Sequence, residues 1–373
     1  MTRKNMICSV LCVFFVLFLL ITSAACTSSE NTGYNDSKTV SYTDEFGRTL
    51  EVPADPQRVI STCPTTTTLV YMLAPDRLLG WNNKPDTTNM PEKYAKLPVI
   101  GGWFGLWSGN YETMLAANPD LVIYETTYDT TDKSDTTSLE EKQANFGSVP
   151  VVGIYDSGNL SVLDDTITKV GNLLGTGEKA EELIKFHDEM EELVKSRIQN
   201  ISGENRTKVY YAETPSGLST DTAGTDHARL ISLCNGINVA NITQQGGQMG
   251  QTEVSMEQVL SWNPDVIICN QKNCYDEILN DSVWGQLDAV KNGRVYYNPR
   301  GPFCWFDRPP GASTILGIPW TAKVLYPDLF SDVDLESLTR GFYSEFLHYD
   351  LSDDELRTLM LGVPYSSGEG GKQ

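Results

Sequence analysis

The side chains best suited to hold a ligand gather in one loop, PRGPFCWFDRPPG, which ends at Gly311. Its prolines restrict the backbone, while Arg300, Trp305 and Arg308 present two guanidinium groups and an indole. Such groups stack on planar or chelated ligands and form charge-assisted hydrogen bonds with carboxylate or phosphate. The alternative is a surface network in which Asp307 pairs with Arg308. The loop therefore predicts a binding site for a small molecule.

Four further residues are candidates for the same site. A second aromatic loop, GGWFGLWSGNYE, carries Trp103 and Trp107, which follow neither a helical nor a strand period. We expect at least one of these tryptophans to face a ligand, and the alternative is that they pack under the loop. Thr65 lies in the first turn of a helix predicted to start at Cys63-Pro64, where backbone N–H groups have no helical partner. His227 lies in a polar loop of the second half of the chain.

No catalytic or metal-binding signature accompanies these residues. The three histidines, His187, His227 and His348, are far apart in sequence, which argues against a bare zinc or manganese site built on several imidazoles. The chain has no G-x-S-x-G motif and no P-loop. Gly175-x-Gly177 follows a predicted helix and not a strand, so it does not fit a dinucleotide-binding turn. We therefore expect a binding protein without a resident metal or cofactor, and not an enzyme.

The elements that position these loops repeat within the chain. Glu112–Ile123, ETMLAANPDLVI, returns 145 residues later at Glu257–Ile268 as EQVLSWNPDVII. In each copy an acidic residue opens a short helix, Asn118 or Asn263 ends it, and the next proline forbids continuation. Unbroken apolar runs follow, as expected for parallel strands covered on both faces. The repeat predicts an α/β fold with two similar lobes, each built on a parallel-type sheet.

One long helix is expected to bridge the lobes, at residues 177–202. The N-terminal α/β lobe is predicted at 40–176, the C-terminal α/β lobe with a helical tail at 203–363, and a disordered end at 364–373. Short strands are predicted at 49–52, 58–61, 78–80, 149–154, 209–211 and 294–297.

The N-terminus has the pattern of an export signal. Arg3 and Lys4 precede an apolar run that is short for a full membrane span, and small residues then lead to Cys26. We expect a signal peptide at 1–25, lipid on Cys26 and a flexible tether at 26–39. An uncleaved N-terminal anchor is the alternative. The protein is then exported and anchored to the outer face of the cell membrane, or periplasmic.

The composition indicates which classes of partner the protein can bind. The formal charge of −21 at pH 7 argues against nucleic acid and anionic lipid, and favours small, neutral or cationic partners. A length of 373 residues, 40% of them hydrophobic, suffices for two cored lobes. The cysteines outside the signal and lipid positions are odd in number and scattered, so at most Cys269 and Cys274 could pair. We expect a monomer with a small-molecule ligand and no nucleic acid.

The mature chain resembles the substrate-binding proteins of ABC transporters for siderophores, haem and cobalamin. The resemblance rests on TDEFGRTLEVPADPQRVIS, on the two E-x-x-L-x-x-N-P-D units, on AGTDHARLISLCNGINVA and on WFDRPP…LYPDLF. Ile237 stands where the family usually has a second glycine. The resemblance implies the architecture of class III periplasmic binding proteins, in which one helix bridges two lobes. It also implies that the lobes clamp a metal chelate, such as a ferric siderophore, haem or a corrinoid, with little hinge motion.

The resemblance also implies roles for individual residues. Glu112 and Glu257 stand where the family has one acidic residue per lobe to dock on permease arginines. Trp107 lies near the family's cleft tryptophan, and Trp305 and Arg308 match a segment most like the cobalamin binders. The implied partners are a permease, through it an ATPase, and the membrane through the lipid anchor. A surface-tethered adhesion module and an enzyme of the related chelatase-like two-lobed fold are the remaining alternatives.

Overall fold

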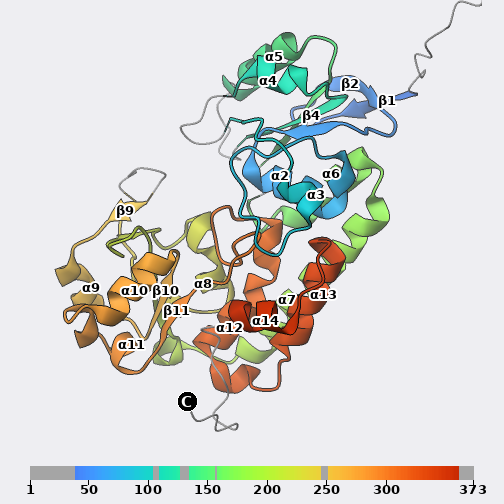
Figure 1. Ribbon diagram of the computed structural model, residues 1–373. Coiled ribbons are helices and arrows are strands. Elements are labelled where there is room, and N and C mark those ends of the chain that lie inside the picture. The colour runs from blue at the N-terminus through green and yellow to red at the C-terminus, as the bar shows by residue number, and fades with distance from the viewer. Residues whose placement is uncertain (1–37, 104–108, 127–133, 156–157, 245–250, 361–373) are drawn as a thin grey trace, which may run out of the picture. The chain divides into compact units, whose positions relative to one another are not determined.

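The computed structural model of the protein describes residues 38–103, 109–126, 134–155, 158–244 and 251–360 (Figure 1). Among these residues, no helix combines the length and the apolar character needed to cross a membrane. The predicted signal peptide, Cys26, nearly all of the tether, Trp107 and the C-terminal residues 364–373 lie outside the described residues.

The N-terminal lobe is built on a parallel three-stranded sheet of order β3-β4-β5. β4 (Leu121–Thr126) lies between β3 (Val59–Ser61) and β5 (Val151–Tyr155). An antiparallel hairpin of β1 (Thr39–Thr43) and β2 (Thr49–Pro53) precedes this sheet. The helices of the lobe are α2 (Pro64–Leu73), α3 (Glu92–Ala95), α4 (Tyr111–Ala116), α5 (Ser134–Phe146) and α6 (Leu163–Leu174).

The C-terminal lobe has a parallel four-stranded sheet of order β11-β10-β6-β8. Its strands are β6 (Lys208–Ala212), β8 (Ile237–Asn238), β10 (Val266–Cys269) and β11 (Val295–Tyr297), and a small antiparallel pair is formed by β7 (Ser219–Thr220) and β9 (Thr252–Glu253). The helices are α8 (Arg229–Leu233), α9 (Met256–Trp262), α10 (Lys272–Asn280), α11 (Asp288–Lys291), α12 (Gly317–Leu325), α13 (Leu335–Phe346) and α14 (Asp353–Met360). β10 therefore has the same inner place in its sheet as β4 has in the other.

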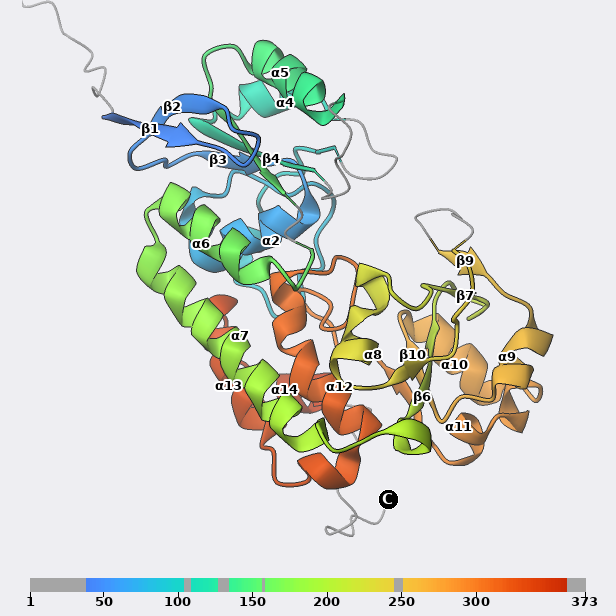
Figure 2. The ribbon, with the colours of Figure 1, turned by 180° about the vertical axis from the view of Figure 1, so that it is seen from behind.

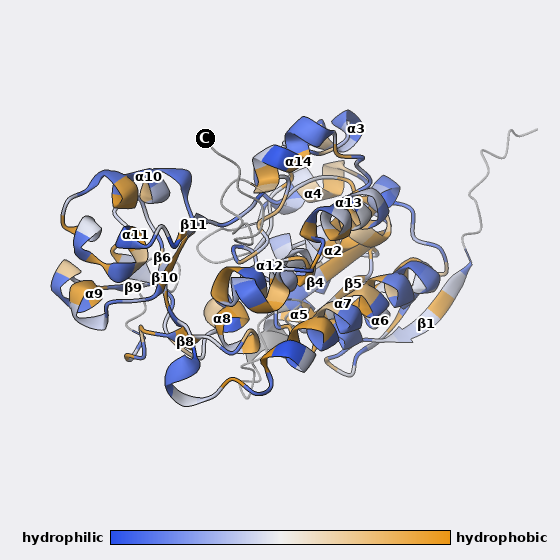
Figure 3. Cartoon of the chain, turned by 90° about the horizontal axis from the view of Figure 1, so that it is seen from below, coloured by the Kyte–Doolittle hydropathy of each residue, from blue (hydrophilic) through white to orange (hydrophobic). Residues whose placement is uncertain are grey.

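The repeated units have the conformation that the sequence predicts. α4 and α9 are each followed by an asparagine in the left-handed region, Asn118 with φ 53° and Asn263 with φ 39°, which asparagine tolerates better than most residues. In both inner strands, the first and third residues belong to the largest hydrophobic core and the second and fourth to a separate core. The unbroken apolar runs therefore serve two cores at once, and Figure 3 shows hydrophobic stretches in orange along β10 and β11.

α7 (Gly177–Ile198) is the bridging helix, and it ends ahead of the predicted residue 202. Figure 2 shows it running from α6 toward the segment that leads into β6. It packs against α6 of the first lobe and against α12 of the second. Its buried hydrophobic residues belong to the largest core, which also contains residues of both lobes. The two lobes are therefore joined by a continuous core.

Two sequence predictions about local structure need correction or refinement. The strand predicted at 78–80 is reduced to isolated bridges, from Leu78 to Val59 and from Trp81 to Val99. The helical tail is divided into α13 and α14, because the chain adopts a left-handed turn at His348 with φ 58°. The described cysteines are all free and buried, including Cys269 and Cys274.

Candidate functional site

The aspartate of each repeated unit ties its strand to the neighbouring strand. The Asp120 carboxylate accepts hydrogen bonds from the backbone N–H groups of Gln57 (2.8 Å) and Arg58 (2.9 Å), just before β3. The Asp265 carboxylate accepts one from the N–H of Lys208 (2.8 Å), at the start of β6. Hydrogen bonds to a charged acceptor are stronger than those between neutral groups. The same device thus fixes strand position in both lobes.

A cavity of about 180 Å³, here called the first cavity, lies between the two lobes. The N-terminal lobe contributes the start of α2, which follows β3, and the segment 81–86, while the C-terminal lobe contributes residues 300–309, which follow β11. Ligands of open α/β sheets bind outside the carboxyl ends of the strands, which is where this cavity lies. Its described lining includes the cations Lys84, Arg300 and Arg308 and a single carboxylate, Asp86.

Arg300 is a cation of this lining whose hydrogen-bond partners are neutral. Its Nη2 donates to the backbone carbonyl (2.6 Å) and side-chain oxygen (3.0 Å) of Asn270 and contacts Cys304 Sγ at 2.8 Å. Its Nε is buried and has no hydrogen-bond partner. Arg300 makes no salt bridge with any residue that the structure describes. A partly buried cation with neutral partners favours an anion beside it.

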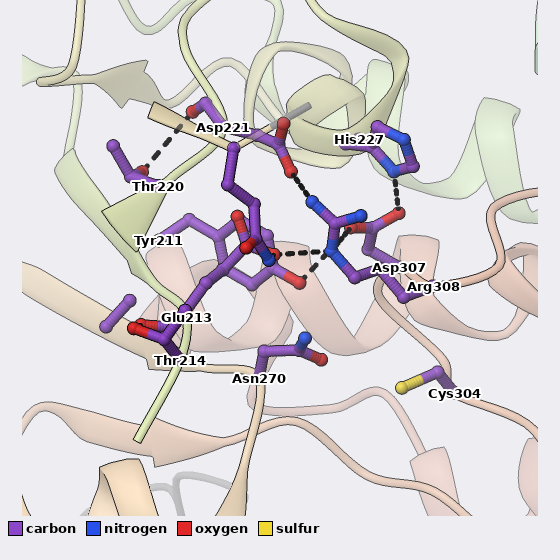
Figure 4. Close-up of polar contacts among 12 residues, drawn as sticks. Tyr211, Glu213, Thr214, Thr220, Asp221, His227, Asn270, Cys304, Asp307 and Arg308 are labelled. Atoms are coloured by element: carbon purple, nitrogen blue, oxygen red, sulfur yellow. Dashed lines mark hydrogen bonds and ion pairs between the residues drawn. The ribbon is translucent and has the colours of Figure 1, made fainter. Parts of the chain in front are cut away.

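Arg308, in contrast, is held inside an acidic cage (Figure 4). Its Nε donates to Glu213 Oε1 (2.5 Å) and its Nη2 to Asp221, while Asp307 Oδ2 lies 3.5 Å from Nε. All three carboxylates are fully buried, so the network is not the surface pair considered from the sequence. Burial raises the pKa of Glu213 to about 8, despite the opposing effect of Arg308. Asp221 and Asp307 therefore compensate the charge of Arg308 where it lines the first cavity.

His227 acts on this cage and does not line the first cavity. Its Nδ1 lies 2.6 Å from Asp307 Oδ1, and Tyr211 Oη donates to the other oxygen of Asp307 (3.3 Å). Burial disfavours the charged ring, but the hydrogen bond and charge of Asp307 raise the pKa of His227 above its ordinary value. Potential ligand atoms of Asp221, His227 and Asp307 lie within 4.8 Å of one another, as in a metal site. The guanidinium of Arg308 already bonds Asp221 and so supplies the positive charge at this place.

Thr65 does not line the first cavity, in contrast to the ligand-binding role that the sequence suggested. Its hydroxyl donates to the Glu125 carboxylate (2.7 Å), which also accepts the backbone N–H of Thr66 (3.2 Å). Glu125, at the end of β4, therefore occupies the N-terminus of α2, where the helix dipole favours a negative charge. The first cavity is lined instead by Thr67 and Thr68. The run of four threonines at the start of α2 was the sequence feature that could have indicated these two residues.

The tryptophans correct the prediction of an aromatic binding surface. Trp305 is 2% exposed, belongs to the largest core and donates from Nε1 to Tyr343 Oη (3.2 Å), so it has no face free for stacking. The Trp305 backbone N–H donates to the carbonyl of Pro299, which folds the loop back on itself. Trp103 is half-buried and packs against Tyr111, with ring centroids 4.9 Å apart, and it does not line the first cavity.

Among the described residues, the aromatic side chains that line the first cavity are Trp81 and Phe303. Their ring centroids are 6.1 Å apart, and both rings contact that of Tyr71. Sequence reasoning missed Trp81, which lies alone after a short apolar run. No local pattern brings it to a loop more than 200 residues further along the chain.

Glu112 and Glu257 occupy equivalent places in the two lobes. Each is exposed in the first turn of its helix, α4 or α9. Both helices are capped by side chains, α4 by Asn110 and α9 by a capping box that begins at Ser255. Hydrogen bonds from its own backbone and from Ser255 lower the pKa of Glu257. Both carboxylates are thus available to a partner.

Comparisons with known proteins agree with this architecture. The sequence model of the periplasmic binding protein family matches residues 59–300. The chain is 28% identical over 268 residues to the molybdate-binding protein MolA of Haemophilus influenzae, covering 66% of this chain and 72% of that one. It is 26% identical over 305 residues to the iron(3+)-hydroxamate-binding protein FhuD of Bacillus subtilis, covering 76% and 88% of the respective chains.

A solved structure gives the same result. The ABC transporter solute binding protein from Sulfurospirillum deleyianum shares 28% identity and superposes with a TM-score of 0.77, covering 86% of this chain and 99% of that one. Fold, cavity position and sequence agree. The chain belongs to the periplasmic binding protein family and is a substrate-binding protein of the ABC transporter class.

Proposed function

We propose that this protein captures an anionic metal chelate between its lobes and delivers it to the permease of an ABC importer. The observation that supports an anion is Arg300, whose guanidinium lines the first cavity with neutral hydrogen-bond partners and a buried, unpartnered Nε. Lys84 adds a second cation to the same lining. The net charge of −21 suggested neutral or cationic partners, but the local charge at the cavity is what a ligand meets.

The size of the first cavity limits which chelates can bind. Its volume of about 180 Å³ is below the roughly 300–1,000 Å³ typical of sites for drug-sized ligands. A compact ferric chelate with carboxylate groups therefore fits the proposal better than haem or a corrinoid. Hydroxyl and amide groups of Thr68 and Asn83 in the lining can supply additional hydrogen bonds.

A bare metal oxyanion is the second candidate cargo. The small cavity favours it, as does the similarity to MolA, which binds molybdate. Both candidates are anions, so both depend on Arg300. We propose that neither is chemically changed by this protein, which has no catalytic role.

Delivery requires a permease and a place at the membrane. We propose that Glu112 and Glu257 dock on the permease, one from each lobe, because both are exposed on equivalent helices. We further propose that lipid on Cys26 anchors the exported protein, as the sequence around it indicates.

The cargo can be identified on protein purified from its native host. A visible absorption spectrum, a mass spectrum and an elemental analysis together distinguish ferric chelates, haem, corrinoids and molybdate. We expect one equivalent of iron or molybdenum in an anionic small molecule. A neutral or cationic organic ligand without metal would contradict the proposal.

A further inference from the structure

A second cavity, of about 560 Å³, lies on another side of Arg300. Of the residues that the structure describes, Arg300 alone lines both cavities. The second cavity is formed between α10, the end of β11 and α14, with residues 88–89 of the N-terminal lobe. Its lining is Thr88, Asn89, Lys272, Tyr275, Tyr297, Pro299, Arg300, Asp354, Glu355, Thr358 and Leu359. The cargo site described above uses none of these residues except Arg300.

Aromatic surface dominates one part of this cavity. The rings of Tyr275 and Tyr297 have centroids 6.4 Å apart and planes inclined by 47°. The Arg300 guanidinium lies 5.7 Å from the centroid of Tyr297, within the range of a cation–π contact. Leu359 adds an apolar side chain from α14. A flat, apolar ring would be well packed here.

The charges that face the second cavity leave one cation available. Lys272 pairs with Asp276 one turn along its own helix, and Asp354 pairs with Arg357 on α14. The Glu355 carboxylate accepts hydrogen bonds from residues just before α14, including the N–H of Ser352 (2.8 Å). Arg300 makes no salt bridge within the part of the chain that the structure describes, and its Nε is buried and unpartnered. Among the described residues of this lining, Arg300 is therefore the cation without a carboxylate partner, while Glu355 is held by neutral donors.

We propose that the second cavity binds a small aromatic carboxylate. The ring would pack against Tyr275 and Tyr297, and the carboxylate would accept hydrogen bonds from Arg300, which prefers planar anions of this shape. The volume of about 560 Å³ is ample for such a molecule. Because the same guanidinium faces the first cavity, an occupant of the second cavity competes with the cargo for Arg300. The two ligands should then weaken each other reciprocally.

Three related probes test the chemistry of this site. Benzoate has both the ring and the charge, benzamide lacks the charge, and cyclohexanecarboxylate lacks the aromatic ring. Saturation-transfer NMR titrations of the purified protein should give a Kd for benzoate on the order of 0.1–1 mM, as expected for a ligand of this size. The other two probes should bind at least about tenfold more weakly, because each loses one of the two interactions. Equal affinities for the three probes would overturn the proposal, as would the absence of saturable benzoate binding.

Two tryptophan substitutions locate the binding. Thr358→Trp places a large side chain at an exposed position of α14 that lines the second cavity, and it should weaken benzoate binding at least about tenfold by filling the space. Leu279→Trp is the matched control, because Leu279 is an exposed apolar residue of α10 outside the lining. The control should change benzoate affinity by less than about twofold. Tyr275→Leu gives a second test from α10 if Thr358→Trp does not fold.

Arg300→Gln should weaken benzoate binding about tenfold to a hundredfold through loss of a charge-assisted hydrogen bond. Unchanged binding in this variant or in Thr358→Trp would place benzoate elsewhere and overturn the assignment. Benzoate is the only ligand in these titrations, so their outcome does not depend on which cargo the first cavity takes.

Discussion

The two lobes share one scaffold and differ in the residue that comes directly after, or at the end of, the inner strand. In the N-terminal lobe, β4 ends near Glu125, whose carboxylate is bound at the N-terminus of α2. In the C-terminal lobe, β10 leads into Asn270, a neutral residue that holds Arg300 at the first cavity. The aspartate ties of Asp120 and Asp265 are retained in both lobes. The repeat therefore preserves strand position, while the residues at the ends of the inner strands differ in charge between the lobes.

The difference between Glu125 and Asn270 explains why the two lobes do not present equivalent groups to an anion. A carboxylate at the start of α2 blocks that helix N-terminus for an anionic ligand, although the N-terminus alone would attract one. Arg300 makes no salt bridge with a described residue, and its hydrogen-bond partners are neutral, although Asp86 lies in the same lining. We infer that the C-terminal lobe supplies the main anchor for the cargo and that the N-terminal lobe closes the cavity around it.

The largest predicted effect concerns the two exposed glutamates that occupy equivalent places in the lobes. Glu112→Lys combined with Glu257→Lys should reduce uptake by at least about a hundredfold, because like charges meet at an interface. Uptake is measured in membrane vesicles that contain the permease, with cargo affinity of the purified variant as control. Cargo affinity should be unchanged, since both residues are exposed and outside the first cavity. Normal transport by the double variant would show that the docking assignment is wrong.

The loop tryptophans provide a second comparison between lobes. Trp305→Ala should lower the free energy of unfolding by about 3–5 kcal/mol, because it empties a site in the largest core. Trp103→Ala should cost about 1–2 kcal/mol, since its ring is half-buried and covers a smaller core. Urea unfolding followed by circular dichroism measures both values. A Trp305 variant of wild-type stability and weaker cargo binding would restore the role in stacking that the sequence suggested.

Two buried titratable groups should make stability fall with rising pH in different ranges. Burial disfavours a charged His187, but hydrogen bonds and charges of Asp164 and Glu191 raise its pKa from 6.5 to about 9. The folded state then holds a proton that the unfolded state releases above pH 6.5. This stabilisation is complete below pH 6.5 and is lost as pH rises through 9, on the order of 3 kcal/mol at most. In Glu213, burial raises the pKa from 4.5 to about 8, so stability falls over that lower range.

Unfolding in urea at a series of pH values separates these contributions. The variant His187→Gln should lose the part of the pH dependence between 6.5 and 9, whereas Glu213→Gln should lose the part between 4.5 and 8. Identical pH profiles of stability for the wild type and His187→Gln would contradict the raised pKa of His187 in the bridging helix.

The smallest predicted effect is the difference in stability loss between alanine variants of Asp120 and Asp265. Asp120→Ala removes an acceptor for two backbone N–H groups and should cost about 2–3 kcal/mol, whereas Asp265→Ala removes an acceptor for one and should cost about 1–2 kcal/mol. Thermal or urea unfolding gives the difference. A larger loss for Asp265→Ala would mean that the ties are not equivalent in kind.

Local patterns were sufficient to predict the scaffold. The prolines, the left-handed asparagines and the apolar runs of the repeated units act over a few residues, so the α/β lobes and the bridging helix could be derived from them. The site depended on distant partners. Glu213 and Asp221, which accept hydrogen bonds from Arg308, come 95 and 87 residues earlier in the chain. Asp307, next to Arg308 in sequence, indicated a local ion pair but not the two distant carboxylates, and no local pattern indicated the neutral partners of Arg300.

The burial of Trp305 was inaccessible to sequence reasoning for a related reason. Its partner Tyr343 belongs to α13, and the contact forms only when the helical tail packs under the loop. An aromatic residue in a proline-rich loop therefore has two physical outcomes, stacking on a ligand or burial in a core. The choice is made by an element 38 residues further along the chain.

The central claim is tested most directly by a calorimetric titration of cargo into the wild type and Arg300→Gln. The cargo is the compound recovered from the native host, and Arg197→Gln, on the surface of α7, serves as control. We predict that Arg300→Gln weakens binding by about tenfold to a hundredfold, with unchanged melting temperature, while the control binds as the wild type does. Wild-type affinity in Arg300→Gln would contradict the claim that a guanidinium with neutral partners in the C-terminal lobe holds an anionic cargo.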